Sequence, residues 1–329
     1  MAQVIFRTNM FRKSLGRTLA GLVTLAAVAA ALVAPAQAVS APLSDPRIQV
    51  HFNLKANQRP ESIIFEPGGA ANLALAGSNQ IVRVSQSGEV SSLATLPAAP
   101  DGGAGVPVLG YSLATGLVRT SNGTLYVGYV TGRDDLNGIW RIRPGKTPQH
   151  IVAIPGTGFP NGMDLDERTG QLYFSDSVLG LIWRVPLAGG RPTVWLRDPL
   201  LTRTEILGVN GLKIRNGAVW ASNSDQGTLL RIPIQRDGRP GPVQTRSSGM
   251  VGIDDFAFVG DSNAVIAALN IPNRVELIRA DGSHSVLLEA ADGISGPTTI
   301  GVRGTTVYVA SASYLLNEDP NLLLATLTP

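Results

Sequence analysis

The sequence predicts an all-β protein, a six-bladed β-propeller of four-stranded antiparallel blades, and three observations support this. A short apolar motif recurs six times at intervals of 44 to 54 residues, a period typical of propellers and solenoids. Most repeats contain four short β-branched or aromatic runs bounded by Gly, Pro, Asn or Asp, the pattern of antiparallel strands joined by turns. Beyond residue 38, no stretch has the length and apolar period of an amphipathic helix. The residues at the matched position of the six motifs are Glu61, Thr115, Asn161, Asn210, Asp254 and Thr298.

Residues 1–38 are predicted to be a secretory signal peptide. Four basic residues precede an apolar run over residues 19–33, and Ala36-Gln37-Ala38 matches the small-residue cleavage pattern. A membrane anchor is the alternative, but the run is shorter than the roughly 20 residues that span a bilayer. We therefore expect residues 39–329 to form a single propeller domain that is secreted or periplasmic, with no membrane span after cleavage.

The predicted signal peptide dominates the net charge of the chain. It holds four of the 27 basic residues and no acidic residue, so residues 39–329 carry 23 basic and 24 acidic residues. Because that part of the chain has a net charge of −1 and no basic cluster, nucleic acid is not expected as a partner. The chain also has no cysteine, which excludes disulfides, thiolate metal ligands and cysteine nucleophiles.

The third repeat shows the predicted blade most clearly. Its predicted strands cover residues 161–166, 172–175, 181–185 and 193–196. The sixth repeat lacks a fourth strand, which residues 48–52, just before the first repeat, can supply. Such pairing of the two ends of the domain closes the ring and leaves few sheet edges exposed. Residues 97–111 and 198–209 are predicted to be long loops that shape one face.

Four of the six matched residues are strong oxygen donors: Glu61, Asn161, Asn210 and Asp254. Inner strands of a propeller follow the central channel, so the first residue of each can point at the axis from one end. Oxygen ligands without His or Cys suit Ca²⁺, and less selectively Mg²⁺ or Mn²⁺, with Zn²⁺ not excluded. A single Asn-Gly pair is most often turn chemistry, but a turn requires neither the Glu nor the Asp. The sequence therefore predicts a divalent metal site, with the two threonines lining the channel.

Histidine is scarce, and this restricts the catalytic possibilities. The three histidines, His51, His150 and His284, do not begin an inner strand, so a histidine general base or triad is not expected. With fewer protein ligands than the six to eight that Ca²⁺ takes, the ion would keep positions open for water and substrate. Hydrolysis would then rely on the metal and on Asp254 or Asp255 as general base. Asp255 could alternatively be a fifth ligand or support the other ligands.

The chain resembles the senescence marker protein/gluconolactonase family of six-bladed, calcium-type lactonase propellers. The resemblance covers the chain beyond residue 38 and is clearest in Pro160-Asn161-Gly162-Met163-Asp164 and Val209-Asn210-Gly211-Leu212. It implies that Glu61, Asn161, Asn210 and Asp254 bind one divalent metal at the channel mouth. Gluconolactonase-type members carry an Arg where this chain has Phe159. This difference favours a more apolar ester or lactone over a sugar lactone, in a pocket lined by Phe159, Tyr111 and Leu207.

The sequence therefore predicts an exported metal-dependent hydrolase of the lactonase or esterase type that acts on a small molecule. Two alternatives come from other functional classes. One is a non-catalytic extracytoplasmic binding or scaffold propeller, in which the ion only holds the blades together. The other is a cyclase or isomerase of a secondary metabolite, which would use the channel mouth as a shaped pocket.

Overall fold

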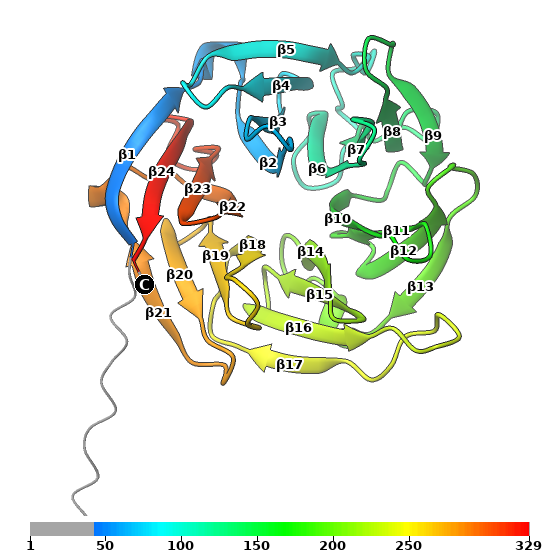
Figure 1. The fold of residues 1–329 in the computed structure, drawn as a ribbon. Helices are drawn as coiled ribbons and strands as arrows, with labels where there is room; N and C mark the ends of the chain where they lie inside the picture. Colours follow the sequence, from blue (N-terminus) through cyan, green and yellow to red (C-terminus); the bar gives the residue numbers. More distant parts are fainter. Residues whose placement is uncertain (1–42, 329) are drawn as a thin grey trace, which may run out of the picture. The chain divides into compact units, whose positions relative to one another are not determined.

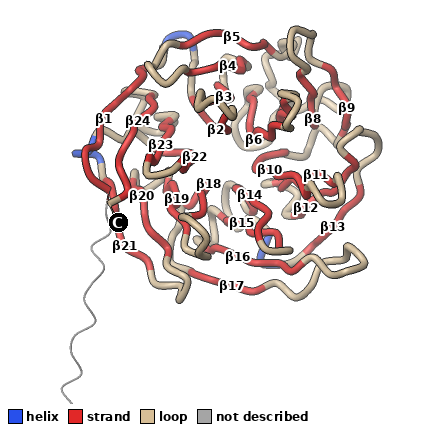
Figure 2. The backbone as a smooth tube through the Cα atoms, viewed as in Figure 1, coloured by secondary structure: helices blue, strands red, loops and turns tan. Residues whose placement is uncertain are grey.

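The computed structural model describes residues 43–328, which form a closed ring of six four-stranded antiparallel sheets around a central axis (Figure 1). Figure 2 shows that strands and the loops between them make up nearly all of this ring. Its helices are short 3-10 turns: η1 (Leu54–Ala56), η2 (Pro199–Leu201) and η3 (Ala290–Asp292). The prediction of an all-β, six-bladed propeller is confirmed. The predicted signal peptide, residues 1–38, lies outside the described residues, and within 43–328 no helix is long and apolar enough to cross a membrane.

In the first five blades, the innermost strand comes first in the chain and the outermost strand comes last. The sixth blade combines the last three strands of the chain with the first one, so it contains both ends of the described residues. The first three blades contain β2 (Pro60–Phe65), β3 (Ala71–Leu75), β4 (Gln80–Val84), β5 (Val90–Thr95), β6 (Leu113–Arg119), β7 (Leu125–Val130), β8 (Gly138–Ile142), β9 (Gln149–Ala153), β10 (Pro160–Asp166), β11 (Gln171–Asp176), β12 (Leu181–Pro186) and β13 (Thr193–Arg197). The fourth to sixth blades contain β14 (Val209–Arg215), β15 (Ala218–Asn223), β16 (Thr228–Pro233), β17 (Gln244–Ser247), β18 (Ile253–Phe258), β19 (Val265–Leu269), β20 (Arg274–Ile278), β21 (His284–Leu288), β22 (Pro297–Arg303), β23 (Thr306–Ser311), β24 (Asn321–Leu327) and β1 (Leu43–His51).

The sixth blade is completed by the N-terminal strand, as the sequence predicts. β1 pairs antiparallel with β24, and the register joins Leu43 to Leu327 and His51 to Asn321. In Figure 1, blue β1 lies on the outside of red β24. The pairing satisfies the backbone groups that an open sheet edge would leave exposed, so the ring closes through hydrogen bonds between the two ends of the domain.

Burial is greatest in the second strand of most blades and least in the fourth, and the sequence reflects this. The second strands β3, β7, β15 and β19 are buried along their whole length and read as continuous runs of apolar and small residues, because neighbouring blades cover both faces. The fourth strands are largely exposed; in β5, for example, only Ala94 is partly buried. Apolar side chains of adjacent blades meet between the sheets, as Tyr173 and Trp195 of the third blade do with Leu212 of the fourth.

The inner strands approach one another closely at the matched positions. Each of them has a register irregularity near its start, and bulges of this kind re-aim side chains. Gly162 and Gly211 follow the two asparagines within strands, so the turn interpretation of these Asn-Gly pairs does not apply. A Cβ on Gly162 would lie 2.5 Å from the carbonyl oxygen of Asn210, and one on Gly211 would lie 2.8 Å from that of Asp254. The glycines therefore allow neighbouring inner strands to pack side by side.

Candidate functional site

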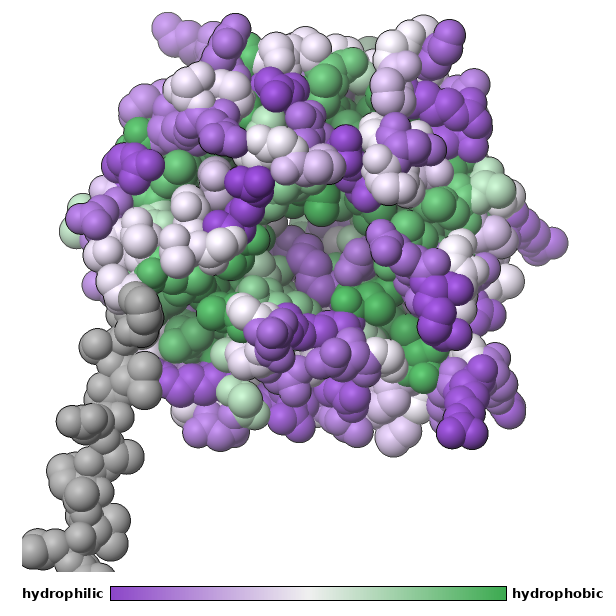
Figure 3. Space-filling model, viewed as in Figure 1, coloured by the Kyte–Doolittle hydropathy of each residue, from purple (hydrophilic) through white to green (hydrophobic). Residues whose placement is uncertain are grey.

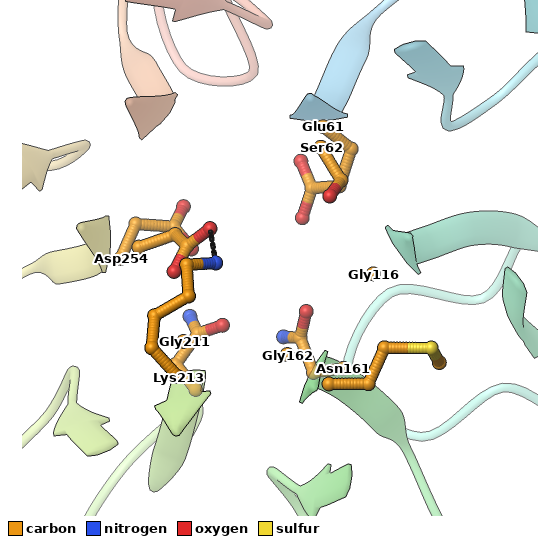
Figure 4. A pocket seen from close by; sticks show the side chains of 11 residues that line it. Glu61, Ser62, Gly116, Asn161, Gly162, Gly211, Lys213 and Asp254 are labelled. Carbon is orange, nitrogen blue, oxygen red and sulfur yellow. Dashed lines mark hydrogen bonds and ion pairs between the residues drawn. The ribbon is translucent and has the colours of Figure 1, made fainter. Parts of the chain in front are cut away.

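The four predicted oxygen donors lie together at one end of the central channel. Each is the second residue of its inner strand: Glu61 in β2, Asn161 in β10, Asn210 in β14 and Asp254 in β18. Figure 4 shows Glu61, Asn161 and Asp254 directed from three sides toward a common space. All four residues line both a narrow space within the channel and a larger cavity at its mouth. The repeat therefore places two carboxylates and two amides around one point.

The two matched threonines have a different role. The Thr115 hydroxyl donates a hydrogen bond to the carbonyl oxygen of Pro160 at 2.8 Å, and the Thr298 hydroxyl donates one to that of Pro60 at the same distance. Both side chains are fully buried, and neither residue is among those that line the two spaces. The threonines connect neighbouring blades, so the prediction that they line the channel is not supported by their geometry.

Two serines, which the sequence analysis did not single out, orient the asparagine amides. Nδ2 of Asn161 donates to the Ser177 hydroxyl at 3.1 Å, and Nδ2 of Asn210 donates to the Ser224 hydroxyl at 3.0 Å. The serines in turn donate to carbonyl oxygens of the next blade, at 2.7 and 2.6 Å. Because each amide nitrogen is held in this way, the carbonyl oxygen of each Asn is free to accept from a ligand or to bind a cation. The repeated Ser-Xaa-Ser at 175–177 and 222–224 was the available sequence signal.

The two carboxyl groups lie in surroundings that disfavour their negative charge. Burial raises the pKa of Glu61 to about 8, and the nearby charge of Asp255 adds to this, although a hydrogen bond from Tyr314 opposes it. Burial also raises the pKa of Asp254 well above its usual value, and the charges of Glu61 and Asp255 raise it further. Buried carboxylates that repel each other in this way are stabilised by a cation between them.

The residues present fit a hard divalent cation. Two carboxylates and two amide oxygens are ligands that Ca²⁺ binds readily. Lys213 also lines the narrow channel space, but its ammonium group is paired with Asp255. Within residues 43–328, no cluster of three or more His, Cys, Asp or Glu side chains is arranged to hold a metal. Any metal at the channel mouth would therefore depend on both amides, which the serines hold in place.

An ion pair lies next to the donors, one layer further along the channel. Nζ of Lys213 is 2.7 Å from Oδ2 of Asp255 (dashed line in Figure 4). The same oxygen also accepts a hydrogen bond from the Thr299 hydroxyl at 2.9 Å. The other oxygen of Asp255 is buried and has no hydrogen-bond partner. Asp255 lines the narrow channel space but not the larger cavity. Of the two predicted general bases, Asp254 is the one that faces the cavity.

The larger cavity has a volume of about 430 Å³ and apolar walls. Its lining includes the three predicted pocket residues Tyr111, Phe159 and Leu207, together with further aliphatic side chains from loops around the mouth. Phe159 is only 1% exposed and packs with Tyr111 and Leu207 in one apolar cluster. Among the described residues that line this cavity, none is Lys, Arg or His. Figure 3 shows a hollow at the centre of the visible face, bordered by hydrophobic side chains.

Tyr314 is a cavity residue that the sequence analysis missed. Its hydroxyl donates a hydrogen bond to Oε2 of Glu61 at 2.8 Å, and burial followed by the charge of Glu61 raises its pKa well above the usual value. The loop that carries it is held by Arg59, whose guanidinium donates to the carbonyl oxygens of Ala312 and Ser313 at 2.9 and 2.6 Å. The same guanidinium lies 5.6 Å from the centre of the tyrosine ring. Tyr314 has no counterpart at this point of the other repeats, so no periodic signal reveals it.

Comparison with known proteins gives information on the fold. No protein-family model matches the sequence, and a search of curated proteins finds no match. Among solved structures, the chain is similar to virginiamycin B lyase from Staphylococcus aureus, with 15% identity, a TM-score of 0.58 and coverage of 86% of this chain and 100% of that one. It is also similar to the calcium-binding protein regucalcin from Agrobacterium tumefaciens, with 15% identity, a TM-score of 0.62 and coverage of 87% and 93%. A luciferin-regenerating enzyme has 10% identity, a TM-score of 0.63 and coverage of 86% and 95%.

Proposed function

We propose that this chain is an exported, divalent-metal-dependent hydrolase of neutral apolar esters or lactones, related to the senescence marker protein/gluconolactonase family. The observation that carries the proposal is the set of four oxygen donors from four different blades at the polar floor of an apolar cavity. The fold likeness to a calcium-binding regucalcin and to a luciferin-regenerating enzyme is consistent with it. Ca²⁺ is the preferred ion, because the donor set contains oxygen alone.

Glu61, Asn161, Asn210 and Asp254 would hold the ion. When bound there, a divalent ion supplies Lewis acidity toward the carbonyl oxygen of an ester or lactone. The apolar walls bind the rest of the substrate and exclude water from it, and the carbonyl is directed toward the floor of the cavity. Because no Lys, Arg or His is among the described residues that line the cavity walls, an anionic group bound away from the proposed ion would find no partner for its charge.

Asp254 is the proposed general base. In the reaction, a water oxygen bonds to the carbonyl carbon, the bond from that carbon to the ester oxygen breaks, and a proton from the water passes by way of Asp254 to the departing oxygen. Tyr314 keeps the Glu61 carboxylate in one orientation through its hydrogen bond. Asp255 takes no direct part in this scheme, since it is bound to Lys213 and Thr299.

Histidine-based chemistry does not fit this site. A histidine variant of the similar virginiamycin B lyase is catalytically inactive. In this chain His51, His150 and His284 lie on the outermost strands β1, β9 and β21, and none of them lines the cavity. The proposal therefore gives the proton transfer to a carboxylate.

The decisive experiment combines calcium titration, thermal melting and hydrolysis of chromogenic esters and lactones by the purified protein. At 100 times its dissociation constant, bound Ca²⁺ should stabilise the fold by about 2.7 kcal/mol. We expect a chelator to reverse this and to abolish hydrolysis. Asn210→Ala combined with Asp254→Ala should lose both calcium binding and activity, whereas Thr298→Ser, at the same repeat position but outside the cavity, should keep both.

The outcomes separate the proposal from its alternatives. Metal-dependent hydrolysis that survives in the double variant would show that the site assignment is wrong. A chelator that lowers the melting temperature while no ester or lactone is hydrolysed would favour a scaffold propeller with a structural ion.

A further inference from the structure

The exposed apolar side chains of this protein are not scattered evenly. Residues 43–328 expose ten large hydrophobic side chains. Four of them lie on outermost strands: Val90, Leu93, Val194 and Val286. The other six lie on loops at the cavity end of the ring: Val108, Ile206, Val251, Ile271, Leu315 and Leu316. Isolated exposed hydrophobic residues are normal on protein surfaces, but a group around one mouth indicates a binding surface.

Three of these side chains extend the cavity wall to the outside. Ile206, Ile271 and Leu315 line the cavity and are 45%, 53% and 66% exposed. They belong to loops that lie next to one another in the ring, before β14, between β19 and β20, and between β23 and β24. They therefore form an apolar strip along one side of the mouth, which we call the rim. An elongated ligand fits a strip better than a compact one does.

Two of the three loops that carry the rim, those of Ile206 and Leu315, are held in place by the polar contacts of Asp225 and Arg59. Oδ2 of Asp225 accepts hydrogen bonds from three successive backbone amides, those of Thr204, Glu205 and Ile206, at 2.7 to 2.9 Å. The loop of Leu315 is held by Arg59, through its hydrogen bonds to the carbonyl oxygens of Ala312 and Ser313. A binding surface whose loops are already ordered loses less conformational entropy when a ligand binds. These two parts of the rim are thus built as a fixed surface.

We propose that the substrate carries a long unbranched apolar chain that leaves the cavity across the rim, while its carbonyl group lies at the four oxygen donors. The position of the carbonyl rests on the proposed function, but the binding of the chain does not. The walls and the rim offer aliphatic and aromatic contacts, and no Lys, Arg or His lies among the described lining residues. A neutral ester of a fatty acid, or the lactone of a hydroxy fatty acid, has this chemistry. Each has one polar end and an apolar tail whose removal from water is favourable.

The test measures binding separately from hydrolysis. Straight-chain methyl ketones from 2-butanone to 2-decanone cannot be hydrolysed and can be titrated calorimetrically into the calcium-loaded protein. Each additional methylene that is fully buried contributes about 0.8 kcal/mol, so affinity should rise by up to about fourfold per carbon and then level off beyond the rim. An affinity that does not depend on chain length would overturn the proposal.

Matched surface variants locate the chain. Ile271→Ser and Leu315→Ser change exposed side chains, so both should fold, and both should weaken binding of 2-decanone at least fivefold while affecting 2-butanone much less. Val194→Ser and Val286→Ser, at apolar residues that are each 41% exposed on β13 and β21, should leave the whole series unchanged. If the β13 and β21 variants weaken 2-decanone as strongly as the rim variants do, the rim is not the binding surface.

A parallel assay with p-nitrophenyl esters of two to ten carbons separates this inference from the proposed function. If ketone affinity rises with the length of the ketone but no ester is hydrolysed, the proposed hydrolase activity is refuted, while the binding site for an apolar ligand chain at the rim is supported. If esters are hydrolysed but the KM is the same for short and long acyl chains, the hydrolase activity is supported and the binding site for an apolar ligand chain at the rim is refuted. Tight binding to neutral lipid vesicles that is lost in Ile271→Ser and Leu315→Ser, with no chain-dependent binding of ketones, would show that the rim contacts a membrane surface, which also contradicts the proposal.

Discussion

Replacing Lys213 by methionine tests the ion pair that lies next to the oxygen donors in the channel. Methionine keeps most of the aliphatic stem and removes the ammonium group, which is 2.7 Å from Oδ2 of Asp255. The two side chains are 27% and 11% exposed, so water replaces the lost partner poorly. The Asp255 carboxylate would keep one hydrogen bond, from Thr299, and would lie near the buried carboxyl groups of Glu61 and Asp254 without the ammonium group beside it.

The expected loss of unfolding free energy can be estimated from measurements on ion pairs in other proteins. Removal of one partner from a buried pair costs about 3–5 kcal/mol of unfolding free energy, and the partial exposure of Lys213 favours about 3 kcal/mol. For a domain larger than 150 residues, a loss of that size lowers the melting temperature by roughly 6–12 °C. Urea unfolding of Lys213→Met, Asp255→Asn and the double variant gives the coupling energy, which we expect to be about 2–3 kcal/mol.

The protein contains a control ion pair with the same distance between its nitrogen and oxygen atoms. Arg239 and Asp237 also lie 2.7 Å apart, but their side chains are 79% and 46% exposed. Arg239→Met should therefore leave the free energy of unfolding nearly unchanged, because water screens an exposed pair. If the effects of Lys213→Met and Asp255→Asn add to within about 0.5 kcal/mol, the two groups do not interact as a buried pair, and the account of the channel is wrong.

Two further predictions concern the contacts around the donors. Tyr314→Phe removes the hydrogen bond to Glu61 and should weaken calcium binding by about 10-fold, the lower end of the range for partners of metal ligands; an unchanged calorimetric affinity would show that Tyr314 does not position the carboxylate. Gly211→Ala places a Cβ 2.5 Å from Oδ1 of Asp255 and should destabilise the fold by about 1–3 kcal/mol, whereas Gly68→Ala, where a Cβ meets open space, should stay within about 1 kcal/mol of the parent.

The features that could be predicted from the sequence are those that every repeat contains. The six matched positions determine the number of blades, and the missing strand of the sixth repeat indicates that residues before the first repeat complete the ring. Both predictions depend only on the local sequence pattern of a strand and on the number of strands in each repeat. The convergence of Glu61, Asn161, Asn210 and Asp254 follows from the same repetition, because equivalent positions in a ring face one axis.

The features that could not be predicted depend on contacts between segments far apart in the chain. Lys213 reads as an exposed charge on a strand, and only the ring brings it to Asp255, 42 residues further on. Tyr314 lies on the loop between β23 and β24, which is longer than the equivalent loops of the other blades, and it reaches Glu61 across 253 residues. The glycines that follow Asn161 and Asn210 are required by the backbone of the neighbouring inner strand, which no local turn rule can reveal.

The hydrogen bonds between blades explain how one repeat position can serve either structure or ligand binding. In the second and sixth blades, the matched threonine itself donates to the carbonyl oxygen that precedes the matched residue of the next blade. In the third and fourth blades, Ser177 and Ser224 donate to the equivalent carbonyl oxygens of Val209 and Ile253. Because a serine directly after the neighbouring strand makes the contact there, the matched residue need not do so. Asn161 and Asn210 are thereby free to face the channel, and the same serines orient their amides. The positions most suited to hold an ion are thus those where the connection between blades is made by another residue.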